Sequence, residues 1–119
     1  MYIEEFYKYD GEETTEVAEL VYLTTLQSWL IYNELSIYES LIITFEELEQ
    51  YAICEGIHRA LSKVEDIMDE RFEQANRLAE TDESYTITHE EHQRISRLVF
   101  EDILKEIYEK QISKYKKDN

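Results

Sequence analysis

The sequence predicts an all-α fold, in the form of an antiparallel bundle of three long helices with a short N-terminal arm and a short connecting segment. Among 119 residues there is no proline and there are only two glycines, so little interrupts a helix. Apolar residues recur at spacings of three and four, as on an amphipathic helix. Four sites place a carboxylate three positions after an N-cap residue, the pattern of a capping box. They are Asp10/Glu13, Ser36/Glu39, Thr44/Glu47 and Thr88/Glu91.

The first long helix is expected over residues 12–35, where apolar side chains cover most of the circumference. A helix that is apolar nearly all round packs against neighbours on several sides. The acidic arm before it carries Tyr2, Tyr7 and Tyr9 beside Phe6. Tyrosine is favoured at interfaces because it combines apolar area with a hydroxyl. The arm therefore either contacts a partner or folds back onto the bundle.

The second helix is expected over residues 45–80, after a connecting segment at 36–43. At about 1.5 Å per residue such a helix spans roughly 54 Å, more than a compact monomer of this size needs. This length predicts a homodimer, or a partner that covers the overhang. Gly56 within it predicts close approach of another helix, near Trp29, rather than a ligand site.

The third helix is expected over residues 89–116, with an apolar row from Ile95 to Ile112 and a solvated face of Glu-to-base pairs. Residues 41–43 and 85–87 are rich in β-branched and aromatic side chains. A minimal two-stranded contact between them is an alternative to helix there. The chain length fits one domain, residues 1–119.

Two pairs of metal-ligating residues lie at helical spacing, Cys54/His58 and His89/His92. In a straight hairpin, however, His58 lies about 19 positions or roughly 28 Å from the point opposite His92. The two pairs therefore cannot share one ion, and Cys54 is expected to pack as a small apolar residue. We expect no metal and no cofactor. The sequence also lacks a nucleophile motif and a phosphate-binding loop, so an enzyme is not expected.

The net charge is −16, from 28 acidic and 12 basic residues. This charge repels nucleic acids and anionic membranes and attracts basic proteins. The longest apolar run is too short and too polar for a membrane span. A single cysteine and an acidic N-terminal segment in place of a signal peptide predict a cytoplasmic protein.

The charge is unevenly distributed, because residues 9–58 contain eleven carboxylates and no lysine or arginine. Two acidic helix stripes with one carboxylate per turn would carry about one charge per 2.7 Å. Duplex DNA carries about one per 1.7 Å and a single strand about one per 3.4 Å. We therefore predict a basic partner, in the sharper case a nucleic-acid-binding protein. The predicted partner-binding residues are Asp10, Glu12, Glu13, Glu16, Glu19, Glu34, Glu39, Glu46, Glu47 and Glu49, with Tyr2, Tyr7 and Tyr9 as anchors.

In size, acidity, helicity and aromatic content the chain resembles the small acidic helical inhibitors of phages, which include DNA-mimic antirestriction proteins and anti-CRISPR proteins. The resemblance implies an inhibitor that occupies a nucleic-acid-binding site. It includes no motif, so no family residue is carried over. The alternative is a homodimeric structural or regulatory bundle that binds a partner through an apolar helix face, with acidity serving only solubility.

Overall fold

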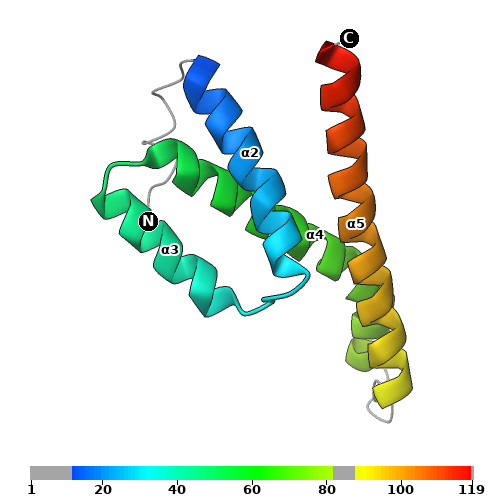
Figure 1. Ribbon diagram of the computed structural model, residues 1–119. Coiled ribbons are helices and arrows are strands. Elements are labelled where there is room, and N and C mark those ends of the chain that lie inside the picture. Colours follow the sequence, from blue (N-terminus) through cyan, green and yellow to red (C-terminus); the bar gives the residue numbers. More distant parts are fainter. Residues whose placement is uncertain (1–11, 82–87, 119) are drawn as a thin grey trace. The chain divides into compact units, whose positions relative to one another are not determined.

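The computed structural model describes residues 12–81 and 88–118, and every regular element in these ranges is an α-helix (Figure 1). The helices are α2 (Glu12–Trp29), α3 (Leu35–Glu47), α4 (Tyr51–Thr81) and α5 (His89–Asp118). The all-α prediction is confirmed. The bundle of three long helices is not confirmed, because the described residues form two long helices of 31 and 30 residues and two shorter ones of 18 and 13. Residues 41–43, considered as a strand, lie within α3.

The chain forms two compact units, Met1–Ser62 and Lys63–Asn119. Unit 1 contains α2, α3 and the first part of α4. Unit 2 contains the rest of α4 and all of α5. The boundary therefore falls inside the continuous helix α4.

Helix α2 ends at Trp29, earlier than the predicted Leu35. The buried side chain of Tyr38 on α3 explains this end. Its hydroxyl donates to the carbonyl oxygen of Tyr32 at 2.7 Å and lies 2.8 Å from the hydroxyl of Ser28. The last carbonyl groups of a helix have no hydrogen-bond partner within the helix and need one from elsewhere. A side chain from the next helix thus fixes the turn.

Helix α3 continues through Thr44, which was predicted to cap the start of the second helix. That prediction is wrong, because the Thr44 hydroxyl donates to the carbonyl oxygen of Ser40 at 2.9 Å, within the helix. Bonding to the carbonyl four residues earlier is the other common use of a threonine hydroxyl. The predicted Ser36 cap is also displaced, since Glu34 holds the N-cap position of α3.

The turn from α3 to α4 is made without glycine. Glu49 adopts a φ of 59°, in the left-handed region. The Glu49 N–H donates to the Glu46 carbonyl at 3.0 Å, and the Gln50 N–H donates to the Phe45 carbonyl at 2.8 Å. These two bonds form a Schellman motif, which usually has glycine at the left-handed position. Helix α4 consequently begins at Tyr51 rather than at Phe45.

Gly56 lies where α2 crosses α4 (Figure 1). A Cβ atom on Gly56 would lie 2.6 Å from the carbonyl oxygen of Ala18 and 2.6 Å from Cβ of Val21. Real Cβ atoms do not approach other atoms this closely, so only glycine fits. The prediction of close helix approach at Gly56 is confirmed, although the contact is with Ala18 and Val21 and not with Trp29.

The core of unit 1 includes a cluster of buried side chains from α3 and α4, formed by Tyr38, Ile42, Cys54 and Ile57. The rings of Trp29 and Tyr38 pack in a tilted arrangement with centroids 5.3 Å apart. The partly buried residues that pack against this core are Val21, Trp29, Phe45, Ile53 and Leu61. Because each of the three helices contributes, unit 1 has a core of its own.

Unit 2 is an antiparallel hairpin of α4 and α5 (Figure 1). Lys63 lies 3.8 Å from Glu106, and the ring of Phe72 packs against that of His92 with centroids 5.6 Å apart. A residue early in α4 thus lies beside one late in α5, and a later residue of α4 lies beside an early one of α5, so the two helices are antiparallel. Buried aliphatic residues form the seam, namely Val64, Ile67, Ala75, Ile95, Val99, Ile103 and Ile107.

The start of α5 follows the prediction. The N–H of Glu91 donates to the hydroxyl of Thr88 at 3.1 Å, and the N–H of His92 donates to the Thr88 carbonyl at 2.9 Å. Thr88 therefore caps the helix as its position in the sequence indicates.

Candidate interaction surface

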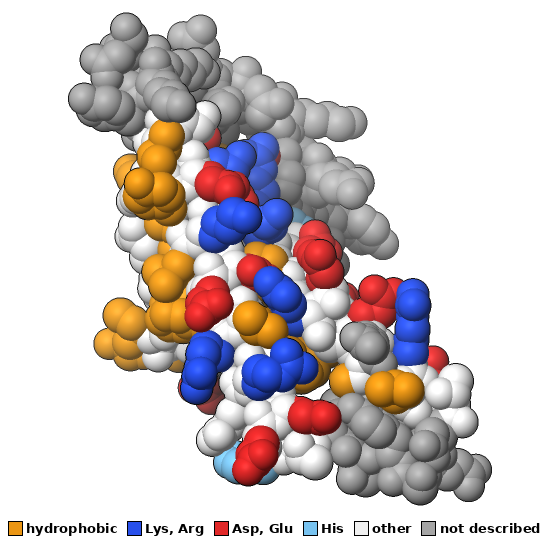
Figure 2. Space-filling view, turned by 90° about the vertical axis from the view of Figure 1, so that its right-hand side faces the viewer, with side chains coloured by type: hydrophobic (Ala, Val, Ile, Leu, Met, Phe, Trp, Pro, Cys, Tyr) orange, Lys and Arg blue, Asp and Glu red, His pale blue; other side chains and the backbone are white. Residues whose placement is uncertain are grey.

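The two units differ in the balance of their charges. Residues 1–62 contain 13 carboxylates and two basic side chains, Lys8 and Arg59, whereas residues 63–119 contain 15 carboxylates and ten basic side chains. Unit 1 thus carries most of the net negative charge of the chain. On the face over α5, lysine and arginine side chains alternate with aspartate and glutamate (Figure 2).

Most of the predicted partner-binding carboxylates within the described part of unit 1 are exposed. Glu16 and Glu19 lie on α2, Glu39 and Glu47 lie on α3, and Glu34 and Glu49 flank α3. Glu34 makes no side-chain capping bond although it holds the N-cap position. These carboxylates are therefore available to a partner.

The remaining predicted residues fall outside what the structure describes. Asp10, Tyr2, Tyr7 and Tyr9 lie outside the described residues. Glu12 and Glu13 belong to the first turn of α2, but their side chains are not among those described.

Two carboxylates of unit 1 are drawn into the protein. Glu55 is buried and pairs with Arg59 at 2.6 Å. Glu46 is half-buried, and its Oε1 atom is enclosed without a hydrogen-bond partner. Burial of Cys54 raises the pKa of its thiol to about 11, and the negative charge of Glu46 acts in the same direction. Glu46 is thus the least accessible of the predicted partner-binding carboxylates among those described.

The carboxylates of α3 do not form the expected stripe with one charge per turn. Glu39 and Glu47 are eight residues apart, which corresponds to about 12 Å along the axis. Apolar side chains stand out on the same helix, at Ile37, Leu41 and, just after it, Leu48, with 41%, 39% and 61% of their surface exposed. These three residues, here called the outer face of α3, recur at spacings of four and seven and so share one side of the helix. The exposed surface of α3 is therefore both acidic and apolar.

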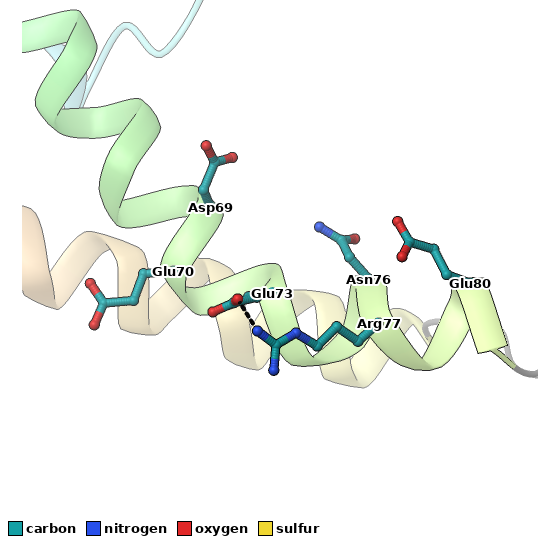
Figure 3. Close-up of a pocket in the computed structure, with 6 residues that line it drawn as sticks. All are labelled: Asp69, Glu70, Glu73, Asn76, Arg77 and Glu80. Atoms are coloured by element: carbon teal, nitrogen blue, oxygen red, sulfur yellow. Dashed lines mark hydrogen bonds and ion pairs between the residues drawn. The ribbon is translucent and has the colours of Figure 1, made fainter.

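A denser acidic row lies on α4 in unit 2. Asp69, Glu70, Glu73 and Glu80 line a surface hollow of about 450 Å³ together with Asn76 and Arg77 (Figure 3). Arg77 pairs with Glu73, which offsets part of the charge. The three- and four-residue spacing of these side chains was the signal for this row. All six residues that line the hollow belong to α4.

Neither of the two pairs that the sequence offered as metal ligands, Cys54/His58 and His89/His92, belongs to a ligand cluster in the described residues. Cys54 is 1% exposed, and its thiol lies 3.5 Å from the carbonyl oxygen of Ile42, to which it donates. His58 and His92 are exposed, and Nε2 of His89 lies 3.1 Å from the side-chain nitrogen of Gln93. Among the described residues, no three or more His, Cys, Asp or Glu side chains are arranged so that they could hold one metal ion. Cys54 packs as the small apolar residue that the sequence predicted.

In the described part of the chain, no helix combines the length and the apolar character that crossing a membrane requires. Comparisons with protein-family models, with curated proteins and with solved structures found no match to this chain.

Proposed function

We propose that the chain is an acidic interaction module whose unit 1 binds a basic surface on a partner protein. The observation that carries this proposal is the absence of compensating charge, since Arg59 is the one cation among the described residues of unit 1 and it pairs with the buried Glu55. The exposed carboxylates of α2 and α3 therefore project a negative field that no described side chain of unit 1 neutralises. Such a field accelerates encounter with basic proteins and opposes contact with nucleic acids.

In its sharper form the proposal is that the partner is a nucleic-acid-binding protein and that the chain occupies its binding site. The compositional resemblance to phage inhibitors of the DNA-mimic class supports this form, as does the pair Glu16 and Glu19, one turn apart on α2. The wider spacing on α3 means that any mimicry is confined to part of the surface. The proposal places the chain in the cytoplasm, where a lone thiol such as Cys54 stays reduced.

A second candidate function is recognition of a partner through an apolar helix face. The observation that favours it is the outer face of α3, whose apolar side chains lie beside Glu39 and Glu47. An amphipathic partner helix could bind there through apolar anchors. In that case the carboxylates would contribute solubility, and affinity would change little with salt.

The test compares two sets of substitutions that remove the same amount of charge. The first set neutralises unit 1 through Glu16→Gln, Glu19→Gln, Glu39→Gln and Glu47→Gln. The matched set neutralises the outer side of α4 in unit 2 through Asp66→Asn, Asp69→Asn, Glu70→Gln and Glu80→Gln. All eight side chains are exposed. Both variants should keep the fold, because neither set removes a described hydrogen bond or ion pair.

Each protein is immobilised and exposed to bacterial lysate, and the captured proteins are eluted with duplex DNA or with rising salt. The wild type should retain nucleic-acid-binding proteins that duplex DNA displaces and that about 1 M salt releases, since the Debye length is then only about 3 Å. The unit 1 set should weaken their binding about 10-fold, or about 1.4 kcal/mol, and flatten its salt dependence. If both sets weaken binding equally, or if the captured proteins stay bound at high salt, the acidic surface of unit 1 is not the binding site. Binding through the outer face of α3 would then be favoured.

A further inference from the structure

Helix α5 carries apolar side chains on two separate faces. Ile95, Val99, Ile103 and Ile107 form the buried row that packs on α4. A second row, here called the α5 stripe, consists of Phe100, Leu104 and Tyr108, with 43%, 44% and 63% of their surface exposed. Figure 2 shows hydrophobic side chains gathered along one side of the face over α5. The described structure leaves this stripe uncovered.

The geometry of the helix separates the stripe from the buried row. Each stripe residue directly follows a buried one, Leu104 after Ile103 and Tyr108 after Ile107, so the stripe lies about 100° further round the helix. Its members are four residues apart and therefore stand one above the other. A contiguous exposed row of this kind, with two aromatic rings, is typical of a surface that contacts another protein.

The charges beside the stripe indicate which protein would cover it. Glu101 and Lys105 follow Phe100 and Leu104 and so form the next row round the helix, where opposite charges alternate. Both are exposed, and no ion pair involves either of them in the described residues. The outer face of α3, by contrast, has only carboxylates beside it. A mixed border is complementary to a second copy of itself.

An antiparallel pairing of two α5 helices makes this complementarity specific. With Leu104 on the two-fold axis, Phe100 of each copy lies level with Tyr108 of the other. Glu101 then lies within two residues of Lys105 of the second copy, or about 3 Å along the axis, on the same side of the contact. The symmetry generates this charge pair twice. A two-fold interface of this kind is self-complementary and closes after two copies.

We propose that the chain forms a homodimer in which the α5 stripes of two copies pack antiparallel, with reciprocal pairs between Glu101 and Lys105. The dimer buries the two aromatic rings and the leucine of each copy in a contact that the hairpin of α4 and α5 presents. This proposal does not depend on the function proposed above. It leaves the acidic surface of unit 1 out of the contact.

Sedimentation equilibrium over a range of micromolar concentrations tests the proposal. The wild type should have twice the 14.4 kDa chain mass. Leu104→Glu, which places two carboxylates at the axis, should be a monomer with an unchanged circular dichroism spectrum. Leu41→Glu on the outer face of α3 is the matched control and should remain a dimer. A wild type of monomer mass at all concentrations, or a control that dissociates, would overturn the proposal.

Charge reversal provides a second test that does not disturb the apolar contact. Glu101→Lys and Lys105→Glu should each weaken the dimer, because each sets two like charges against one another across the interface. The double variant restores opposite charges and should recover the wild-type mass. If both single variants dimerise like the wild type, or if the double variant is no better than they are, the antiparallel register is wrong and the proposal falls.

Discussion

In unit 1, Gly56 brings the backbone of α4 against Ala18 and Val21 of α2, whereas in unit 2 charged side chains join α4 to α5. Arg71 donates from two nitrogens to the carboxylate of Asp102, at 2.6 and 2.8 Å, in addition to the pair of Lys63 and Glu106. Among the described residues of unit 1, the ion pair is that of Arg59 with Glu55. Both residues belong to α4, so this pair does not connect two helices.

This difference separates carboxylates that hold helices together from carboxylates that do not. In unit 2, Asp102 and Glu106 lie beside cations of the facing helix, so part of the acidity has a structural role. Among the described residues of unit 1, no ion pair involves the exposed glutamates, and close apolar packing must hold the helices against their repulsion. Uncompensated charge is therefore a property of the surface of unit 1 and not of its packing.

The largest effect on stability is expected from Gly56→Ala. In an exposed helix this change would stabilise by about 1 kcal/mol. Here the new Cβ would overlap the backbone of Ala18, which cannot move aside without shifting α2. We expect a net loss of about 2 kcal/mol in the free energy of unfolding, measured in urea, because overpacking outweighs helix propensity. Ser62→Ala, at an exposed position of α4, is the control. A more stable Gly56→Ala protein would show that the two helices are not in close contact.

A smaller loss is expected from Tyr38→Phe, which removes only a hydroxyl. That hydroxyl is the partner of the Tyr32 carbonyl and of the Ser28 side chain where α2 gives way to α3. Loss of both bonds should lower the free energy of unfolding by about 1 to 2 kcal/mol. Tyr32→Phe alters an exposed ring and should change it little. Equal effects of the two substitutions would mean that the buried hydroxyl does not fix the turn.

The sequence predicted the features that depend on neighbours in the chain. Thr88 caps α5 as expected because its partner is three residues away, and the apolar rows of α4 and α5 follow helical spacing. The end of α2 was not predictable in this way, since it depends on Tyr38 from the next helix. The end of α3 was not predicted, because Glu49 adopts the left-handed conformation that glycine usually adopts at the end of a helix. The sequence has no glycine there to indicate the turn.

The candidate site was predicted only in part, because the sequence shows which residues are charged but not which side chains another element covers. Counting residues finds the charge imbalance before Arg59, and the structure places Glu16 and Glu39 at the surface. An apolar pattern, however, shows that residues share a face and not whether another element covers it. The apolar side chains of residues 12–35 were therefore expected to pack on several sides, whereas Leu20 and Ile31 are 58% and 74% exposed. Conversely, Glu46 was expected at the surface and has an enclosed oxygen atom.

A gain in stability is expected from Glu49→Gly, in the turn of unit 1. The left-handed conformation costs a residue with a Cβ atom about 1 kcal/mol, and glycine avoids this cost. The variant should unfold at a higher urea concentration, with a gain of about 0.5 to 1 kcal/mol. Glu47→Gly, within α3, removes the same charge and should destabilise instead. Parallel shifts for both variants would attribute the effect to charge rather than to the backbone.

The smallest effect is expected from Asp102→Asn in unit 2, and its dependence on pH identifies its origin. The hydrogen bonds from Arg71 lower the pKa of the Asp102 carboxyl below its ordinary value. A carboxyl whose pKa is lower in the folded state than in the unfolded state stabilises the fold above the unfolded-state pKa of about 3.9. That contribution is lost as the pH falls through the lower folded-state pKa. The wild type should therefore be more stable than the variant at neutral pH, and the difference should shrink below about pH 4. Urea unfolding of both proteins at several pH values measures it, with Glu109→Gln, at an exposed position of α5, as the control. If the difference in stability between the two proteins stays constant down to acid pH, the effect comes from packing. The ion pair of Arg71 and Asp102 would then not stabilise the contact of α4 with α5.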